Sequence, residues 1–67
     1  MLKYTIELLN ENSVSIKTIT INENGETIGE PHRRAYLNDE KERAELIEDL
    51  PEYIQNAVFA VWDANNT

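Results

Sequence analysis

Hydrophobic and polar side chains alternate along the first part of the chain, which predicts β-strands rather than helices. Between residues 2 and 9, apolar side chains at the even positions are separated by Lys3, Thr5 and Glu7. A period of two is typical of a strand with one buried face. The apolar positions are Leu2, Tyr4, Ile6 and Leu8. The Asn-Glu-Asn-Ser run at 10–13 then predicts a turn.

The second predicted strand, residues 14–22, is rich in β-branched side chains but its alternation is irregular. Val14 and Ile16 share one parity, whereas Ile19 and Ile21 share the other. Either the strand carries a bulge near Lys17-Thr18, or its two faces are buried at different ends. We favour the bulge, which would restore a single buried face.

Asn24-Gly25 is the strongest local signal, because this dipeptide suits a two-residue type I′ hairpin in which both residues have positive φ. Such a loop places Glu23 opposite Glu26 and Ile21 opposite Ile28, so that two isoleucines share one face.

The third predicted strand covers about residues 27–36 and contains Gly29 and Pro31. Proline cannot donate to a sheet ladder, so this strand should lie at a sheet edge or carry a bulge.

Helical signals begin after residue 37. Asp39 and Glu42 form a capping box that opens a first helix, with Asn38 as an alternative cap. Asp39 and Arg43 are spaced for a favourable pair. The apolar positions of this helix are Ala44, Leu46, Ile47 and Leu50.

Pro51 interrupts the helical pattern, and a second helix is predicted to start there with Asp49 as its cap and Glu52 three residues later. Its apolar residues follow a helical period on one face, which we expect to cover the sheet. They are Leu50, Tyr53, Ile54, Ala57, Val58, Val61 and Trp62.

These elements predict an α+β fold, a three-stranded antiparallel meander followed by two helices, in the order β-β-β-α-α. We expect one domain over residues 1–63 and a flexible tail over 64–67. A chain of 67 residues has a thin core, and no cysteine is present to form a disulfide. We therefore expect that formation of an oligomer contributes to the stability of the chain.

The net charge of −7 argues against direct binding to nucleic acid or to an anionic membrane. No apolar run is long enough to span a bilayer, and no signal peptide is visible. We expect a cytoplasmic protein.

His32 is the only histidine and lies in the only basic cluster, Pro31-His32-Arg33-Arg34. Nucleophilic catalysis would need a serine or cysteine held by a third group, and no flanking pattern indicates one. We therefore predict no catalytic residue and no enzyme activity. The cluster either blocks edge-to-edge pairing or contacts an acidic surface of a protein partner.

Acidic side chains recur along one stripe of the helical region, at Glu42, Glu45, Glu48 and Glu52. Such a stripe is usually a solvated helix face. The alternative is a surface that mimics phosphates and occupies a nucleic-acid-binding protein. The loop around Asn22-Glu23-Asn24-Gly25 resembles part of a calcium loop but fails, because Pro31 stands where the last acidic ligand belongs. No P-loop, dinucleotide fingerprint or zinc spacing occurs, so we predict no metal, cofactor or small-molecule substrate.

Phe59 lies off the apolar stripe of the second helix, where it either contacts Leu46 or Ile47 or forms part of an interface. Trp62 is the next candidate, because aromatic side chains often mark association sites. Together with the cluster of His32, Arg33 and Arg34, these two residues form the predicted protein interface.

Two segments resemble small uncharacterised phage and prophage proteins of Gram-positive bacteria, often encoded near tail or baseplate genes. The segments are Gly29-Glu30-Pro31-His32-Arg33-Arg34-Ala35-Tyr36 and Leu50-Pro51-Glu52-Tyr53-Ile54-Gln55-Asn56-Ala57-Val58-Phe59-Ala60-Val61-Trp62. The resemblance covers about the second half of the chain and supplies no catalytic residues. It implies an accessory protein, structural or chaperone-like, that works through protein contacts in tail or virion assembly, either in the host cytoplasm or associated with the virion.

The sequence therefore predicts a non-enzymatic, homo-oligomeric protein that binds an unidentified protein partner. The alternative is an acidic inhibitor that mimics nucleic acid and blocks a host DNA-binding or defence protein.

Overall fold

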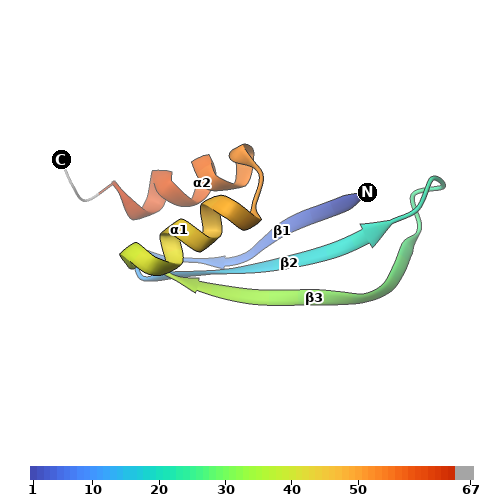
Figure 1. The fold of residues 1–67 in the computed structure, drawn as a ribbon, viewed down its shortest axis with the longest axis horizontal. Helices are drawn as coiled ribbons and strands as arrows, with labels where there is room; N and C mark the ends of the chain where they lie inside the picture. Colours follow the sequence, from blue (N-terminus) through green and yellow to red (C-terminus); the bar gives the residue numbers. More distant parts are fainter. Residues whose placement is uncertain (65–67) are drawn as a thin grey trace.

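The computed structural model describes residues 1–64 and forms a three-stranded antiparallel sheet followed by two helices (Figure 1). The sheet order is β1-β2-β3. This confirms the predicted α+β fold and its element order. The predicted tail, apart from Ala64, lies outside the described residues. The elements are β1 (Leu2–Leu9), β2 (Ser13–Ile21), β3 (Thr27–Leu37), α1 (Glu40–Asp49) and α2 (Glu52–Trp62).

The helices are too short to cover the sheet. A helix of 10 or 11 residues spans about 15 Å, whereas an 11-residue strand such as β3 spans about 36 Å. Both helices pack over the same end of the sheet, and the β2–β3 hairpin projects beyond them (Figure 1). The molecule is therefore elongated, with principal extents of 44 × 20 × 17 Å.

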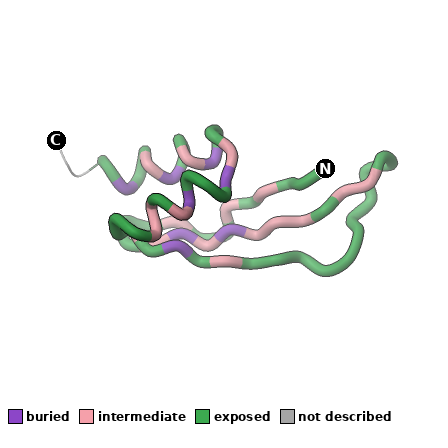
Figure 2. The backbone as a smooth tube through the Cα atoms, in the orientation of Figure 1, coloured by how far each residue is buried: buried purple, intermediate pink, exposed green. Residues whose placement is uncertain are grey.

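The hydrophobic core lies between the helices and one end of the sheet, where the buried positions gather (Figure 2). We call the side of the sheet that faces α1 and α2 its front and the opposite side its back. The sheet contributes side chains from its front to this core, and the helical region contributes about one side chain per helical turn. The buried residues are Val14, Ile16, Tyr36, Leu46, Leu50, Ile54, Val58 and Trp62.

A bulge in β1 corrects the predicted alternation. Ile6 faces Ile16, whereas Leu8 faces Ser15, so Glu7 is an extra residue in the strand. The extra residue reverses the parity after position 7. As a result Leu8 is 63% exposed, and Leu9 packs against the core in its place.

The bulge favoured for β2 near Lys17-Thr18 is wrong. β2 is regular, and the register shift beside it lies in β3, where residues 29–31 stand opposite the single residue Ile19. Val14 and Ile16 are buried on the front, while Ile19 is partly buried on the back. The other interpretation, in which each face is buried at a different end, describes β2 better.

The hairpin loop has three residues rather than the predicted two. Asn22 N–H donates to the Glu26 carbonyl at 3.0 Å, and Asn22 Oδ1 accepts from the Asn24 and Glu26 amides. Among the described residues only Gly25 and Gly29 have positive φ, so Asn24 cannot occupy a type I′ turn. A turn closed by a left-handed Gly25, at φ 83°, is the common three-residue solution. The two isoleucines therefore do not face one another, since Ile28 lies opposite Thr20.

β3 is an edge strand, as predicted from its proline. Gly29, at φ 72°, lies in the irregular segment where the register shifts. Pro31 follows within the same segment and has no N–H to donate. The strand is thus paired with β2 at Thr27 and Ile28, interrupted at 29–31, and paired again from His32 onward.

The predicted capping box at α1 is present in part. The Asp39 carboxylate accepts from Glu42 N–H at 2.7 Å, which satisfies one of the free amides of the first turn. The Glu42 carboxylate reaches back to Leu37 N–H, at 3.3 Å, rather than to the cap residue. The predicted pair of Asp39 with Arg43 is replaced by a pair between Arg43 and Asp63, at 3.0 Å.

Asp39→Ala is expected to lower the free energy of unfolding by about 1 kcal/mol, because it removes the side-chain acceptor of the α1 cap. Urea denaturation followed by circular dichroism measures this change. Lys41→Ala, at an exposed site in the same first turn, is the matched control and should be nearly neutral. Equal losses in the two variants would contradict the role of the cap.

The junction between the helices differs from the prediction. Pro51, not Asp49, is the cap residue of α2, and no side chain caps that helix. Asp49 is the last residue of α1, and its carboxylate points to β3 instead. The Gln55 side chain donates to the carbonyls of Ile47 and Leu50 at the end of α1, which ties the two helices together.

Only half of the predicted apolar stripe of α2 is buried. Positions spaced by four, from Leu50 through Ile54 and Val58 to Trp62, form the core contact. Tyr53 is 63% exposed and Val61 is 36% exposed, so the neighbouring half of the stripe faces outward. α1 shows the same split, with Leu46 buried and Ile47 exposed.

Candidate functional site

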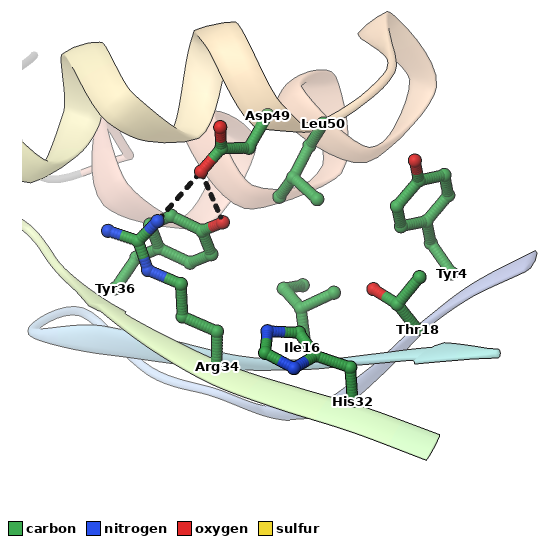
Figure 3. A pocket seen from close by; sticks show the side chains of 8 residues that line it. All are labelled: Tyr4, Ile16, Thr18, His32, Arg34, Tyr36, Asp49 and Leu50. Atoms are coloured by element: carbon green, nitrogen blue, oxygen red, sulfur yellow. Dashed lines mark hydrogen bonds and ion pairs between the residues drawn. The ribbon is translucent and has the colours of Figure 1, made fainter. Parts of the chain in front are cut away.

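A cleft of about 210 Å³ opens on the front of the sheet, beside the junction of the two helices (Figure 3). Ile16 and Leu50 supply apolar walls, and the remaining side chains are polar or amphipathic. The lining residues are Tyr4, Ile16, Thr18, His32, Arg34, Tyr36, Asp49 and Leu50. The cleft therefore lies where the covered half of the sheet meets the uncovered half.

One side of the cleft is fixed by a hydrogen-bonded network between β3 and the end of α1. Asp49 Oδ2 accepts from Arg34 Nη1 at 2.7 Å and from the Tyr36 hydroxyl at 3.0 Å (Figure 3). The Arg34 guanidinium lies over the Tyr36 ring at 4.3 Å and also pairs with Glu45 at 3.4 Å. The arginine thus holds the two elements together through charge and ring contact.

The pKa of the Tyr36 hydroxyl is raised to about 12, chiefly by burial and secondly by its hydrogen bond to Asp49. The nearby Arg34 guanidinium opposes this shift. The residue is only 3% exposed, which agrees with desolvation of the phenolate as the largest cause.

The free energy of unfolding is expected to fall by up to about 2–3 kcal/mol as the pH rises from 10 to 12. The unfolded chain releases the tyrosine proton near pH 10, whereas the folded chain keeps it until about pH 12, so this contribution is complete below pH 10. Urea denaturation at a series of pH values measures the slope. Tyr36→Phe is the control, and it should reduce the dependence of the free energy of unfolding on pH. An unchanged slope in this variant would contradict the assignment of the effect to Tyr36.

The basic cluster is divided between the two faces of β3. His32 and Arg34 lie on the front and line the cleft, whereas Arg33 pairs with Glu7 at 3.1 Å. Because successive strand residues point to opposite faces, the cluster cannot act as one surface. Within residues 1–64, no side chain bonds to the His32 ring, which is exposed at the open side of the cleft.

The two aromatic residues of the predicted interface lie against the core. Trp62 is 4% exposed, and its indole N–H donates to the Asn10 carbonyl at 2.9 Å. Phe59 is partly buried, with its ring 6.0 Å from that of Trp62 and the Arg43 guanidinium 4.7 Å from its centre. Both residues therefore hold α2 in place and offer little surface to a partner.

The predicted acidic stripe is divided as well. Glu42 bonds to Leu37 N–H and Glu45 pairs with Arg34, so both carboxylates serve contacts between α1 and β3. Glu48 and Glu52 are exposed. Half of the stripe thus faces the sheet rather than a partner.

The surface that the sequence pattern misses is the front of the sheet beyond the helices. Leu2 is 53% exposed and Ile28 is 51% exposed, and both face Thr20 from the neighbouring strands. We call the row of Leu2, Thr20 and Ile28, together with Thr18 and His32 beside the cleft, the open sheet face. Exposed apolar side chains on a flat surface are suited to protein contacts. The short helical segments are the feature of the sequence that could have indicated this uncovered surface, since helices of 10 and 11 residues cannot cover the longer strands.

The described residues contain neither a cluster of potential metal ligands nor a membrane-spanning helix. Within residues 1–64, no three His, Asp or Glu side chains gather closely enough to bind a metal ion. None of the helices in this part of the chain has the length and hydrophobicity needed to cross a membrane.

Comparison with protein-family models, curated proteins and solved structures gives no match to this chain. The resemblance to phage proteins therefore stays a prediction, and the open sheet face and the cleft are the features from which function is argued.

Proposed function

We propose that this protein is non-enzymatic and acts through protein–protein contacts, the first of them with a second copy of itself. The observation that carries the proposal is the sheet that extends beyond its two helices and leaves the open sheet face uncovered. A domain of this size gains stability when such a surface is covered by a partner.

The balance of buried and exposed apolar side chains supports this reading. Within residues 1–64, eight hydrophobic residues form the core and eight large hydrophobic residues are exposed. Single exposed apolar residues are ordinary on protein surfaces, but Leu2 and Ile28 share one row of the open sheet face. Their position indicates a contact surface rather than scattered exposure.

The biological setting that we propose is accessory work in phage assembly, in the tail or another part of the virion. It rests on the resemblance of the segments at 29–36 and 50–62. The alternative, an acidic inhibitor that mimics nucleic acid, has less support, because Glu42 and Glu45 are engaged within the domain.

Two double variants test which surface makes the contact. Leu2→Glu with Ile28→Glu places two charges on the open sheet face, while Tyr53→Glu with Val61→Glu places two on the exposed half of α2. The pairs are matched in added charge. Light scattering during size-exclusion chromatography should show the sheet variant as a monomer and the helix variant still associated. Loss of association only in the helix variant would contradict the proposed surface.

A further inference from the structure

The two edges of the sheet differ in how open they are to a further strand. β3 carries Pro31, a left-handed Gly29 and a register shift, all of which hinder pairing. β1 keeps an unbroken register from Leu2 to Ile6 and contains neither proline nor glycine. The β1 edge is therefore the unprotected one.

The hydrogen-bond pattern shows which groups that edge presents. Met1 and Ile21 exchange both of their backbone hydrogen bonds, at 2.8 and 3.1 Å. Hydrogen-bonded and non-hydrogen-bonded pairs alternate in an antiparallel ladder. The backbone groups of Lys3 and Thr5 consequently point to β2, and those of Leu2, Tyr4 and Ile6 point away from the sheet.

We propose that β1 pairs antiparallel with β1 of a second copy, joining the two sheets into one sheet of six strands. This inference rests on the proposed self-association and places its first contact at the β1 edge, where Leu2 of the open sheet face joins the pairing. A two-fold axis at Tyr4 places Leu2 opposite Ile6 of the second copy. The outward backbone groups of these three residues then all find partners across the axis.

Side chains on both faces suit this pairing. On the front, Leu2, which is half exposed in the single chain, lies beside Ile6 of the second copy and loses contact with water. On the back, Lys3 lies opposite Thr5 of the second copy while Glu7 stays paired with Arg33 of its own chain, so no two like charges stand directly opposite each other. The bulge at Glu7 ends the regular segment and limits the pairing to residues 2–6.

The pairing closes on itself. Each copy uses its single open edge once, and the β3 edges that remain are hindered by Pro31 and Gly29. The expected assembly is a two-fold dimer rather than a fibre. Each chain carries a charge of −7, so the two copies repel and the dimer should tighten as salt is added.

Hydrogen exchange of single amides, followed by NMR over a range of protein concentrations at high salt, tests the pairing. Only the dissociated chain exposes the amides of Leu2, Tyr4 and Ile6, so their exchange should slow about tenfold once nine-tenths of the chains are dimeric. The amides of Arg33 and Ala35 point out from the β3 edge, because their neighbours Lys17 and Ser15 bond to β1. They are the internal control and should not slow.

A variant pair gives an independent test. Tyr4→Pro removes an outward N–H that the single chain does not use, so it should give a folded monomer, whereas Tyr4→Ala keeps the N–H and should still dimerise. Association with unprotected β1 amides, or a dimeric Tyr4→Pro variant, would overturn the edge pairing and leave the proposed self-association standing. A chain that never associates would overturn both.

Discussion

Replacing Leu46 by alanine is expected to remove most of the domain's free energy of unfolding. The side chain has no exposed surface and lies in the core between α1 and the sheet. A buried Leu→Ala change costs about 2–5 kcal/mol, and a single core of this size supplies only about 3–5 kcal/mol of net stability. Circular dichroism and urea denaturation measure the loss.

The neighbouring residue offers a matched control. Ile47 is 51% exposed, so Ile47→Ala removes a comparable aliphatic side chain from the other face of α1. It should change the free energy of unfolding by no more than about 0.5 kcal/mol. Similar losses in both variants would mean that the face of α1 that meets the sheet is wrongly assigned.

Trp62→Ala is expected to destabilise the domain by about 3–5 kcal/mol, because a large aromatic side chain is removed from the core. The same change leaves the Asn10 carbonyl without its donor and separates α2 from the turn between β1 and β2. Urea denaturation followed by circular dichroism reads the loss without relying on the fluorescence of the protein's one tryptophan.

Trp62→Phe separates the two contributions. It keeps most of the ring packing but removes the indole N–H, so it should cost about 1–3 kcal/mol for the unsatisfied carbonyl. A Trp62→Ala variant as stable as the wild type would contradict the burial of this residue and restore it as an interface candidate.

Local patterns in the sequence predict most of the fold. The alternation in β1, the apolar period of α2 and the Asp39 cap each depend on residues close together in the chain, so they are visible without the structure. The order β-β-β-α-α follows from them.

The features that the sequence does not reveal depend on pairing between distant residues. The bulge at Glu7 and the shift in β3 are defined only by what stands opposite them, so alternation alone put Leu8 inside. Asp49 fits a helix-cap pattern, yet its carboxylate bonds to Arg34 and Tyr36 of β3. The same holds for Trp62, which an amphipathic pattern cannot distinguish as core or interface.

The candidate site was predicted only in part, for a related reason. His32, Arg33 and Arg34 are adjacent in the chain but lie on two faces of a strand. The open sheet face joins Leu2 to Ile28 through Thr20, three residues that come from three strands. Only the sheet register brings them together.

Sedimentation equilibrium of the unmodified chain, from low micromolar to millimolar concentration, tests the central claim most directly. If the protein acts through contacts that begin with a second copy, its average mass should rise from that of one 7.8 kDa chain toward that of a dimer, and rise further when salt is added. A chain that stays folded and strictly monomeric over the whole range would contradict the account.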